Sequence, residues 1–109
     1  MSTINRVNGG TATASAGAAT LHNRFGVITT EALATAQDAA YTLTISNAQI
    51  AASDMVFASV ANGSNSQGTT VVTKVTPAAG SLVIVVHNKH ASAQALNGTL
   101  KVAFASFPA

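Results

Sequence analysis

The chain of 109 residues contains no cysteine and no tryptophan, and only 7% of its residues are charged. Without cysteine it can form neither disulfides nor thiolate metal sites, and its redox compartment cannot be inferred. The charged fraction is far below the roughly 25% that is typical of soluble domains. A surface poor in charge is buried in an interface at little desolvation cost, so this composition favours a protein that works within an assembly. The alternative is a small extracellular β-domain with a neutral polar surface.

Cationic side chains are also sparse. Five lysines and arginines against three acidic residues give a formal net charge of +2, and the five are scattered along the chain. A nucleic-acid groove needs several phosphate contacts together with stacking aromatic side chains, and the sequence clusters neither. It also has no apolar run long enough for a transmembrane helix and no apolar secretion signal after Met1. We therefore expect a protein made in the cytoplasm of its host cell, with neither a nucleic acid nor a membrane as partner.

The carboxylates do not form a recognisable catalytic pair. Glu31, Asp38 and Asp54 are the only three, and they lie in three different predicted segments. A glycosidase or an aspartic protease needs two carboxylates at a defined separation, and nothing in the sequence brings two together. We expect them on the solvated surface, or, for Asp54 after Ser53, as the cap of a helix or a turn.

The histidines do not form a recognisable metal site either. His87 and His90 share a polar loop, and His22 is distant in sequence. A metal site needs three or four ligands, and no carboxylate lies close in sequence to the pair. We expect solvated or interface histidines; the alternative is that they meet His22 or symmetry copies at an oligomer axis and make assembly pH-dependent. No nucleophile elbow is present, so the sequence predicts neither an enzyme nor a cofactor.

The clearest structural signal is the apolar run Leu82–Val86, in which four of the five residues are β-branched. Turn formers flank it on both sides, so it predicts a central strand buried on both faces. Tyr41–Ser46 alternates strictly between apolar and polar residues, which predicts a strand with one buried face. Further strands are expected at Leu21–Leu33 (with a bulge or kink at Gly26), Met55–Val60, Thr69–Thr76 and Thr99–Phe107. Polar turns join them without a convincing helix, so the predicted fold is all-β: an antiparallel β-sandwich or jelly roll of about six to eight strands.

The first 19 residues differ from the rest in composition. They are mainly Thr, Ala, Ser and Gly, with no apolar periodicity. They are either a disordered tail or an extended arm that becomes ordered against a neighbouring subunit. Small side chains lose little rotamer entropy on ordering, which suits the second possibility. We therefore divide the chain into an extended N-terminal arm, residues 1–19, and a β-sandwich domain, residues 20–109.

Two polar loops, Asn62–Gly68 and His87–Ala95, are the candidates for ligand recognition. Sugar-binding faces usually display exposed tryptophan or tyrosine. The chain has one tyrosine, Tyr41, and its alternation places it on the predicted core face. The phenylalanines are expected in the core or in an interface. They are Phe25, Phe57, Phe104 and Phe107.

Several short segments between Gly26 and Phe107 have a characteristic amino-acid sequence. They are Tyr41–Ile45, Ala58–Gly63, Val75–Val86 and Ala95–Leu100. In these segments the chain resembles small β-rich structural proteins of tailed bacteriophage virions, without any catalytic motif or site residue to carry over. The resemblance implies a capsid decoration (cement) protein, a homotrimer on the capsid surface of the virion that bridges and stabilises subunits of the major capsid protein. The alternative it implies is a head- or tail-fibre module whose loops recognise a cell-surface glycan.

Overall fold

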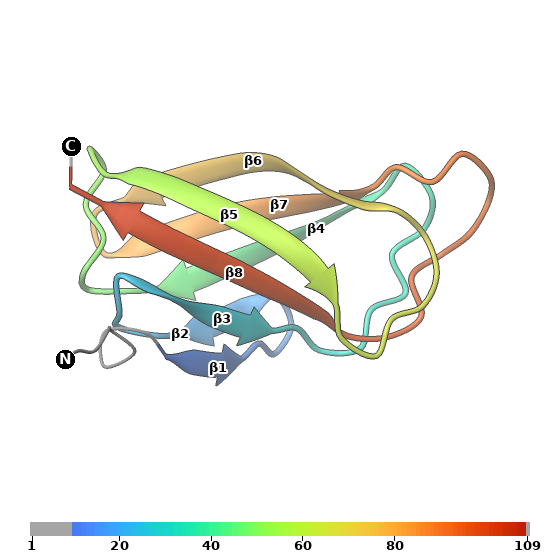
Figure 1. Ribbon diagram of the computed structural model, residues 1–109, viewed down its shortest axis with the longest axis horizontal. Helices are drawn as coiled ribbons and strands as arrows, with labels where there is room; N and C mark the ends of the chain where they lie inside the picture. The colour runs from blue at the N-terminus through green and yellow to red at the C-terminus, as the bar shows by residue number, and fades with distance from the viewer. Residues whose placement is uncertain (1–9, 109) are drawn as a thin grey trace, which may run out of the picture.

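The computed structural model describes residues 10–108, which contain eight strands and no helix. One sheet, sheet A, has the order β1 (Thr11–Thr13), β3 (Phe25–Thr29), β8 (Leu100–Phe107), β5 (Met55–Asn62). The other, sheet B, has the order β2 (Ala18–Thr20), β4 (Ala40–Ser46), β7 (Ser81–Asn88), β6 (Thr70–Ala78). The two sheets pack face to face (Figure 1), which confirms the predicted all-β class and the β-sandwich.

Both sheets are mixed, whereas the sequence predicted antiparallel pairing throughout. β8 pairs with β3 and β5, and β7 pairs with β4 and β6, all antiparallel. The short strands β1 and β2 join β3 and β4 in parallel. β6 and β7 form a hairpin closed by Ala79 and Gly80, and Gly80 has a φ of 81°. Glycine suits this position because other residues rarely adopt a positive φ.

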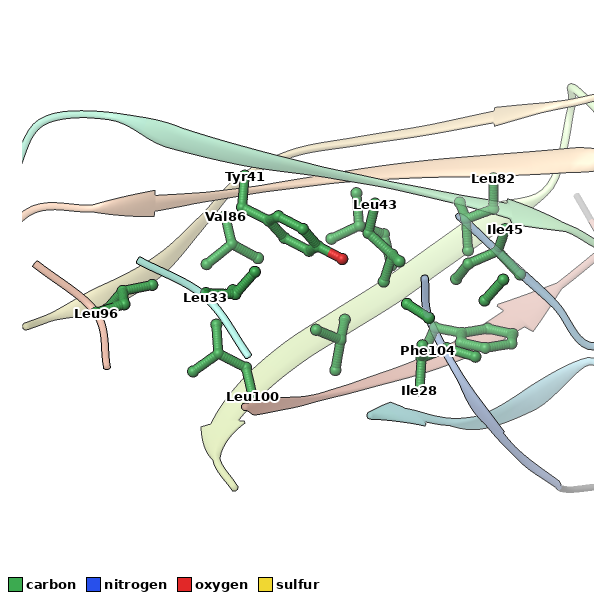
Figure 2. Close-up of a cluster of buried hydrophobic side chains, with 14 residues drawn as sticks. Ile28, Leu33, Tyr41, Leu43, Ile45, Leu82, Val86, Leu96, Leu100 and Phe104 are labelled. Carbon is green, nitrogen blue, oxygen red and sulfur yellow. The ribbon is translucent and has the colours of Figure 1, made fainter. Parts of the chain in front are cut away.

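The core fills the space between the sheets, and most of its buried side chains come from β4, β7 and β8 (Figure 2). Side chains of β5 and β6 pack against it and are partly buried. In β4, Tyr41, Leu43 and Ile45 are buried and the residues between them are exposed, which confirms the predicted alternation. In β8, Leu100, Val102 and Phe104 face inward and are buried, and Lys101 between them is exposed. Several of the aliphatic side chains are completely inaccessible: Ile28, Leu43, Ile45, Leu82, Ile84, Leu100 and Val102.

The run Leu82–Val86 lies in an interior strand, β7, but the prediction that both its faces are buried is wrong. Leu82, Ile84 and Val86 point into the core, whereas Val83 and Val85 are half-buried on the outer face of sheet B. A two-layer sandwich covers only one face of each sheet. The two outward valines are partly covered because β4 and β6 flank them on either side.

The predicted boundary at residue 20 also needs correction, because the sandwich already includes β1 and β2. Ala14 and Ala19 are buried in the core between the sheets. Gly17, with a φ of 79°, connects the two strands, and a Cβ there would lie 2.8 Å from the carbonyl oxygen of Thr42. Residues 10–19 are therefore extended, as predicted for the arm, but they supply one edge strand to each sheet of the domain. Residues 1–9 lie outside the described residues.

Gly26 is not the predicted bulge. It pairs in regular register with Phe104, and a Cβ there would lie 2.6 Å from the carbonyl oxygen of Gly10. The glycine therefore allows the chain entering β1 to approach β3 closely. The register shift that the pairings do contain lies in β6, between Val72 and Lys74.

Candidate assembly surface

The three carboxylates have separate partners, and two of them, Glu31 and Asp54, accept hydrogen bonds that fix a turn. Glu31 accepts hydrogen bonds from the Gly17 backbone N–H at 3.0 Å and from the Tyr41 hydroxyl at 2.9 Å. Burial raises the pKa of Tyr41 well above its ordinary value, and the hydrogen bond and negative charge of Glu31 raise that pKa further. Tyr41 is therefore a neutral donor that fixes Glu31. Asp38 is exposed and lies 3.9 Å from the Lys89 ammonium group.

Asp54 is the predicted turn cap, and the structure confirms that role. Its Oδ2 accepts the Ala51 backbone N–H at 3.0 Å and the Ser106 hydroxyl at 2.9 Å, and Arg24 lies 3.6 Å away. The Ala51 N–H lowers the pKa of Asp54 most; burial opposes this, and Ser106 and Arg24 lower the pKa further. Asp54 is thus an ionised group that links the turn before β5 to the end of β8.

The histidines are not brought together within the chain. His22 accepts the Ala48 backbone N–H through Nδ1, beyond the end of β4 at Ser46. His87 pairs with Ala40 at the other end of β4, and His90 follows it in the next loop. No group of three potential ligands that could hold a metal ion occurs within residues 10–108.

The two candidate loops, Asn62–Gly68 and His87–Ala95, do meet, at one end of the sandwich (right in Figure 1). Gly68 donates its backbone N–H to Gln94 Oε1 at 2.8 Å. Asn65, which is buried, donates to Asn62 and to the Gln67 carbonyl and accepts the Asn97 backbone N–H. Many of the amides that a ligand would need are therefore already used within the loops.

The most distinctive surface is the outer face of sheet A. It carries four of the five large hydrophobic side chains that are exposed in the described part of the chain; the fifth, Val71, lies in sheet B. The four are Phe25, Met55, Phe57 and Phe107, with exposed fractions of 37%, 58%, 62% and 54%. We call this group the apolar cluster.

Sheet register brings the apolar cluster together from three neighbouring strands. Ala105 of β8 pairs with Phe25 on one side and with Phe57 on the other, and Phe107 pairs with Met55. The Phe57 and Phe107 rings pack edge to face, with centroids 5.8 Å apart and an interplanar angle of 85°. Beside them is a shallow hollow of about 210 Å³, because the neighbouring outward residues of β8 are alanines.

This face carries almost no charge. Along β1, β3, β5 and β8 the outward residues are aromatic, aliphatic or small and polar, apart from Lys101. Lys101 pairs with Thr29 and Ala61, away from the apolar cluster. The sequence assigned the phenylalanines to the core or to an interface without separating the two. In the structure Phe104 belongs to the core, and the other three are exposed.

The described residues include no helix long and apolar enough to cross a membrane. Comparisons of the chain with protein-family models, curated proteins and solved structures find no significant match. The function of this chain is therefore inferred from the exposed face of sheet A and from the short segments that resemble virion proteins.

Proposed function

We propose that this chain is a virion structural protein that decorates a phage capsid and stabilises it by bridging major capsid protein subunits. The observation that supports an assembly role is the apolar cluster on the outer face of sheet A. Large exposed apolar patches on soluble proteins are typically interaction sites. The choice of partner comes from the resemblance to small β-rich virion proteins.

The chemistry of this face suits a protein partner. Aromatic side chains and methionine are enriched where protein–protein interfaces are buried, and charged residues are depleted there. Fully burying one such side chain contributes roughly 1.5–3 kcal/mol. A symmetric lattice repeats the contact at many sites, and a protein that binds only the assembled capsid stabilises it by mass action. A homotrimer, as the resemblance implies, would add valency to each contact.

The test is co-sedimentation of the purified chain with capsids that lack it. The wild-type chain should bind saturably at micromolar concentration. Phe25→Ser and Phe107→Ser should each weaken binding by about tenfold or more, because each removes an exposed aromatic ring from the proposed contact. Val71→Ser is the matched control, since Val71 is an exposed apolar residue of the other sheet. Absence of wild-type binding, or equal weakening by the control, would contradict the proposal.

The glycan-binding alternative receives less support from the geometry. The two loops that would carry it are held together by their own amides, as with Asn65 and Gln94. The tyrosine that could stack on a sugar is buried in the core. A glycan array on the wild-type chain tests this alternative directly, and binding that is lost on alanine substitution in these loops would support it over decoration.

A further inference from the structure

β5 is an open edge of sheet A. It pairs with β8 on one side, and no other described strand pairs with it on the other. It is eight residues long, and its sequence, MVFASVAN, contains no charge, no proline and no glycine. Its register with β8 runs from Met55 to Asn62 without a shift. A regular, uncharged edge of this kind offers a row of unpaired backbone N–H and C=O groups to another strand.

The long edge of sheet B has the opposite character. β6 is nine residues long and contains Lys74, Pro77 and a register shift between Val72 and Lys74. A lysine, a proline that lacks an N–H and an irregular register all hinder an edge from pairing with another strand. The third and fourth edges, β1 and β2, have only three residues each. Of the edges in the described part of the chain, β5 is thus the long one without a charge, a proline or a register shift.

A second copy of the chain fits this edge. The outward residues of β5 carry no charge, so an antiparallel pair related by a two-fold axis places no like charges opposite each other. Each copy offers the same open edge, and one two-fold contact satisfies both. Met55 and Phe57, which are more than half exposed beside this edge, would gain neighbours from the second copy.

We propose that β5 pairs antiparallel with β5 of a second copy, so that two four-stranded A sheets become one continuous sheet. The apolar clusters of the two copies then form one extended surface. The inference goes beyond the proposed function and does not depend on it, because it concerns the purified chain alone. It specifies a dimer, whereas the resemblance to virion proteins implies a trimer.

Sedimentation equilibrium tests the mass across about 1 to 300 µM, the range in which a modest interface associates. We expect a monomer–dimer equilibrium for the wild type. Ser59→Lys places a charge at an exposed position of β5, and two copies would bring these charges close together. It should raise the dissociation constant by about tenfold or more. Thr76→Lys, at an exposed position of β6, is the matched control and should leave the constant unchanged.

Three results would overturn the proposal. They are a wild type that stays monomeric over the whole range, a trimer, and an equal effect of both lysine substitutions. Thermal unfolding of each variant checks that it is folded before its mass is interpreted. The capsid assay above uses other variants, so failure of capsid binding leaves this result intact, and the reverse also holds.

A second measurement locates the contact. The sequence has no cysteine, so a single Ser59→Cys carries one spin label without background. Strands in a sheet are about 4.8 Å apart, so two labels on paired β5 strands lie within about 20 Å of each other. Strong dipolar broadening is expected for Ser59→Cys and not for Thr76→Cys. A dimer in which only Thr76→Cys shows broadening would place the contact at β6 and overturn the proposal.

Discussion

Asn88 shows how single polar residues hold the loop end of the sandwich. It is fully buried, and its Nδ2 donates to the carbonyl oxygens of Thr35 and Gln94. Its Oδ1 accepts the backbone N–H groups of Thr69 and His90. All four hydrogen-bonding positions of the amide are therefore occupied, and they link three separate loops.

Asn88→Ala should lower the free energy of unfolding by about 2–4 kcal/mol, because it removes a fully buried side chain and leaves four partly buried backbone groups without these partners. Urea unfolding at neutral pH measures the loss. Asn97→Ala is the control: Asn97 makes similar bonds to Ser66, but at the exposed surface, so its loss should stay below about 1 kcal/mol. Similar losses for the two variants would mean that Asn88 is not the hub of these loops.

Acid should destabilise the fold through Asp54. The pKa of Asp54 is lower in the folded chain than its ordinary value of 3.8, so the ionised carboxylate stabilises the fold above that pH. This contribution is lost as the pH falls through the folded pKa. The free energy of unfolding of the wild type should therefore fall below about pH 4, and Asp54→Asn should reduce that dependence. Urea midpoints between about pH 7 and pH 2 measure this pH dependence.

Asp38→Asn, at an exposed position, is the control and should keep the pH dependence of the wild type. If Asp38→Asn instead removes the loss of stability in acid, Asp54 is not the group responsible.

At the scale of elements, β7 shows both what an apolar run predicts and what it leaves open. The run establishes a strand but does not say how many faces are covered. Ile84→Ala should lower the free energy of unfolding by about 2–5 kcal/mol, because Ile84 is completely buried and its truncation leaves a cavity. Val85→Ala, one residue further and half-buried on the outer face, should cost less than about 1.5 kcal/mol. Urea unfolding compares them, and a larger loss at Val85 would reverse the assigned facing.

The sequence predicts best those strands that have one apolar face and one polar face. Tyr41–Ser46 alternates apolar residues with hydroxyl residues, so both the strand and its buried face follow from the pattern. β1 and β2 contain only alanine and threonine, whose small side chains carry little apolar contrast. Their parallel partners are more than 10 residues away in sequence, so no local turn signal indicates the pairing. For this reason composition suggested an arm where the structure has two strands.

The role of β1 and β2 can be tested by truncation. Deleting residues 1–19 removes β1 and two of the three residues of β2, and it takes Ala14 and Ala19 out of the core. We expect a fall in melting temperature of about 10 °C or more, since about 1 kcal/mol corresponds to 4–8 °C in a domain of this size. The matched truncation, residues 1–9, keeps both strands and should retain a melting temperature above that of the longer deletion. Equal melting temperatures for the two truncations would mean that residues 10–19 do not stabilise the sandwich and are an arm.

At the scale of the whole molecule, the fold follows from the sequence more readily than the surface does. Polar turns and alternating strands indicate two sheets, but alternation alone does not say which of two apolar rows faces inward. In β5 both rows are apolar: Val56, Ala58 and Val60 form one, and Met55 and Phe57 belong to the other. The choice is made by packing against β8 and the opposite sheet, which is non-local. The apolar cluster was therefore not predictable as a site.

Because the apolar cluster is exposed, its rings should contribute little to the stability of the isolated chain. Replacing Phe57 and Phe107 together with serine removes both members of the edge-to-face pair, so neither ring is left without its partner. Because both rings are more than half exposed, the melting temperature should change by only a few degrees, while binding of a fluorescent apolar dye should fall severalfold. Phe104→Ser, on the same strand but buried in the core, should instead cost about 3–5 kcal/mol. If the double variant melts as early as Phe104→Ser does, the two outward rings support the fold itself and are not available to a partner.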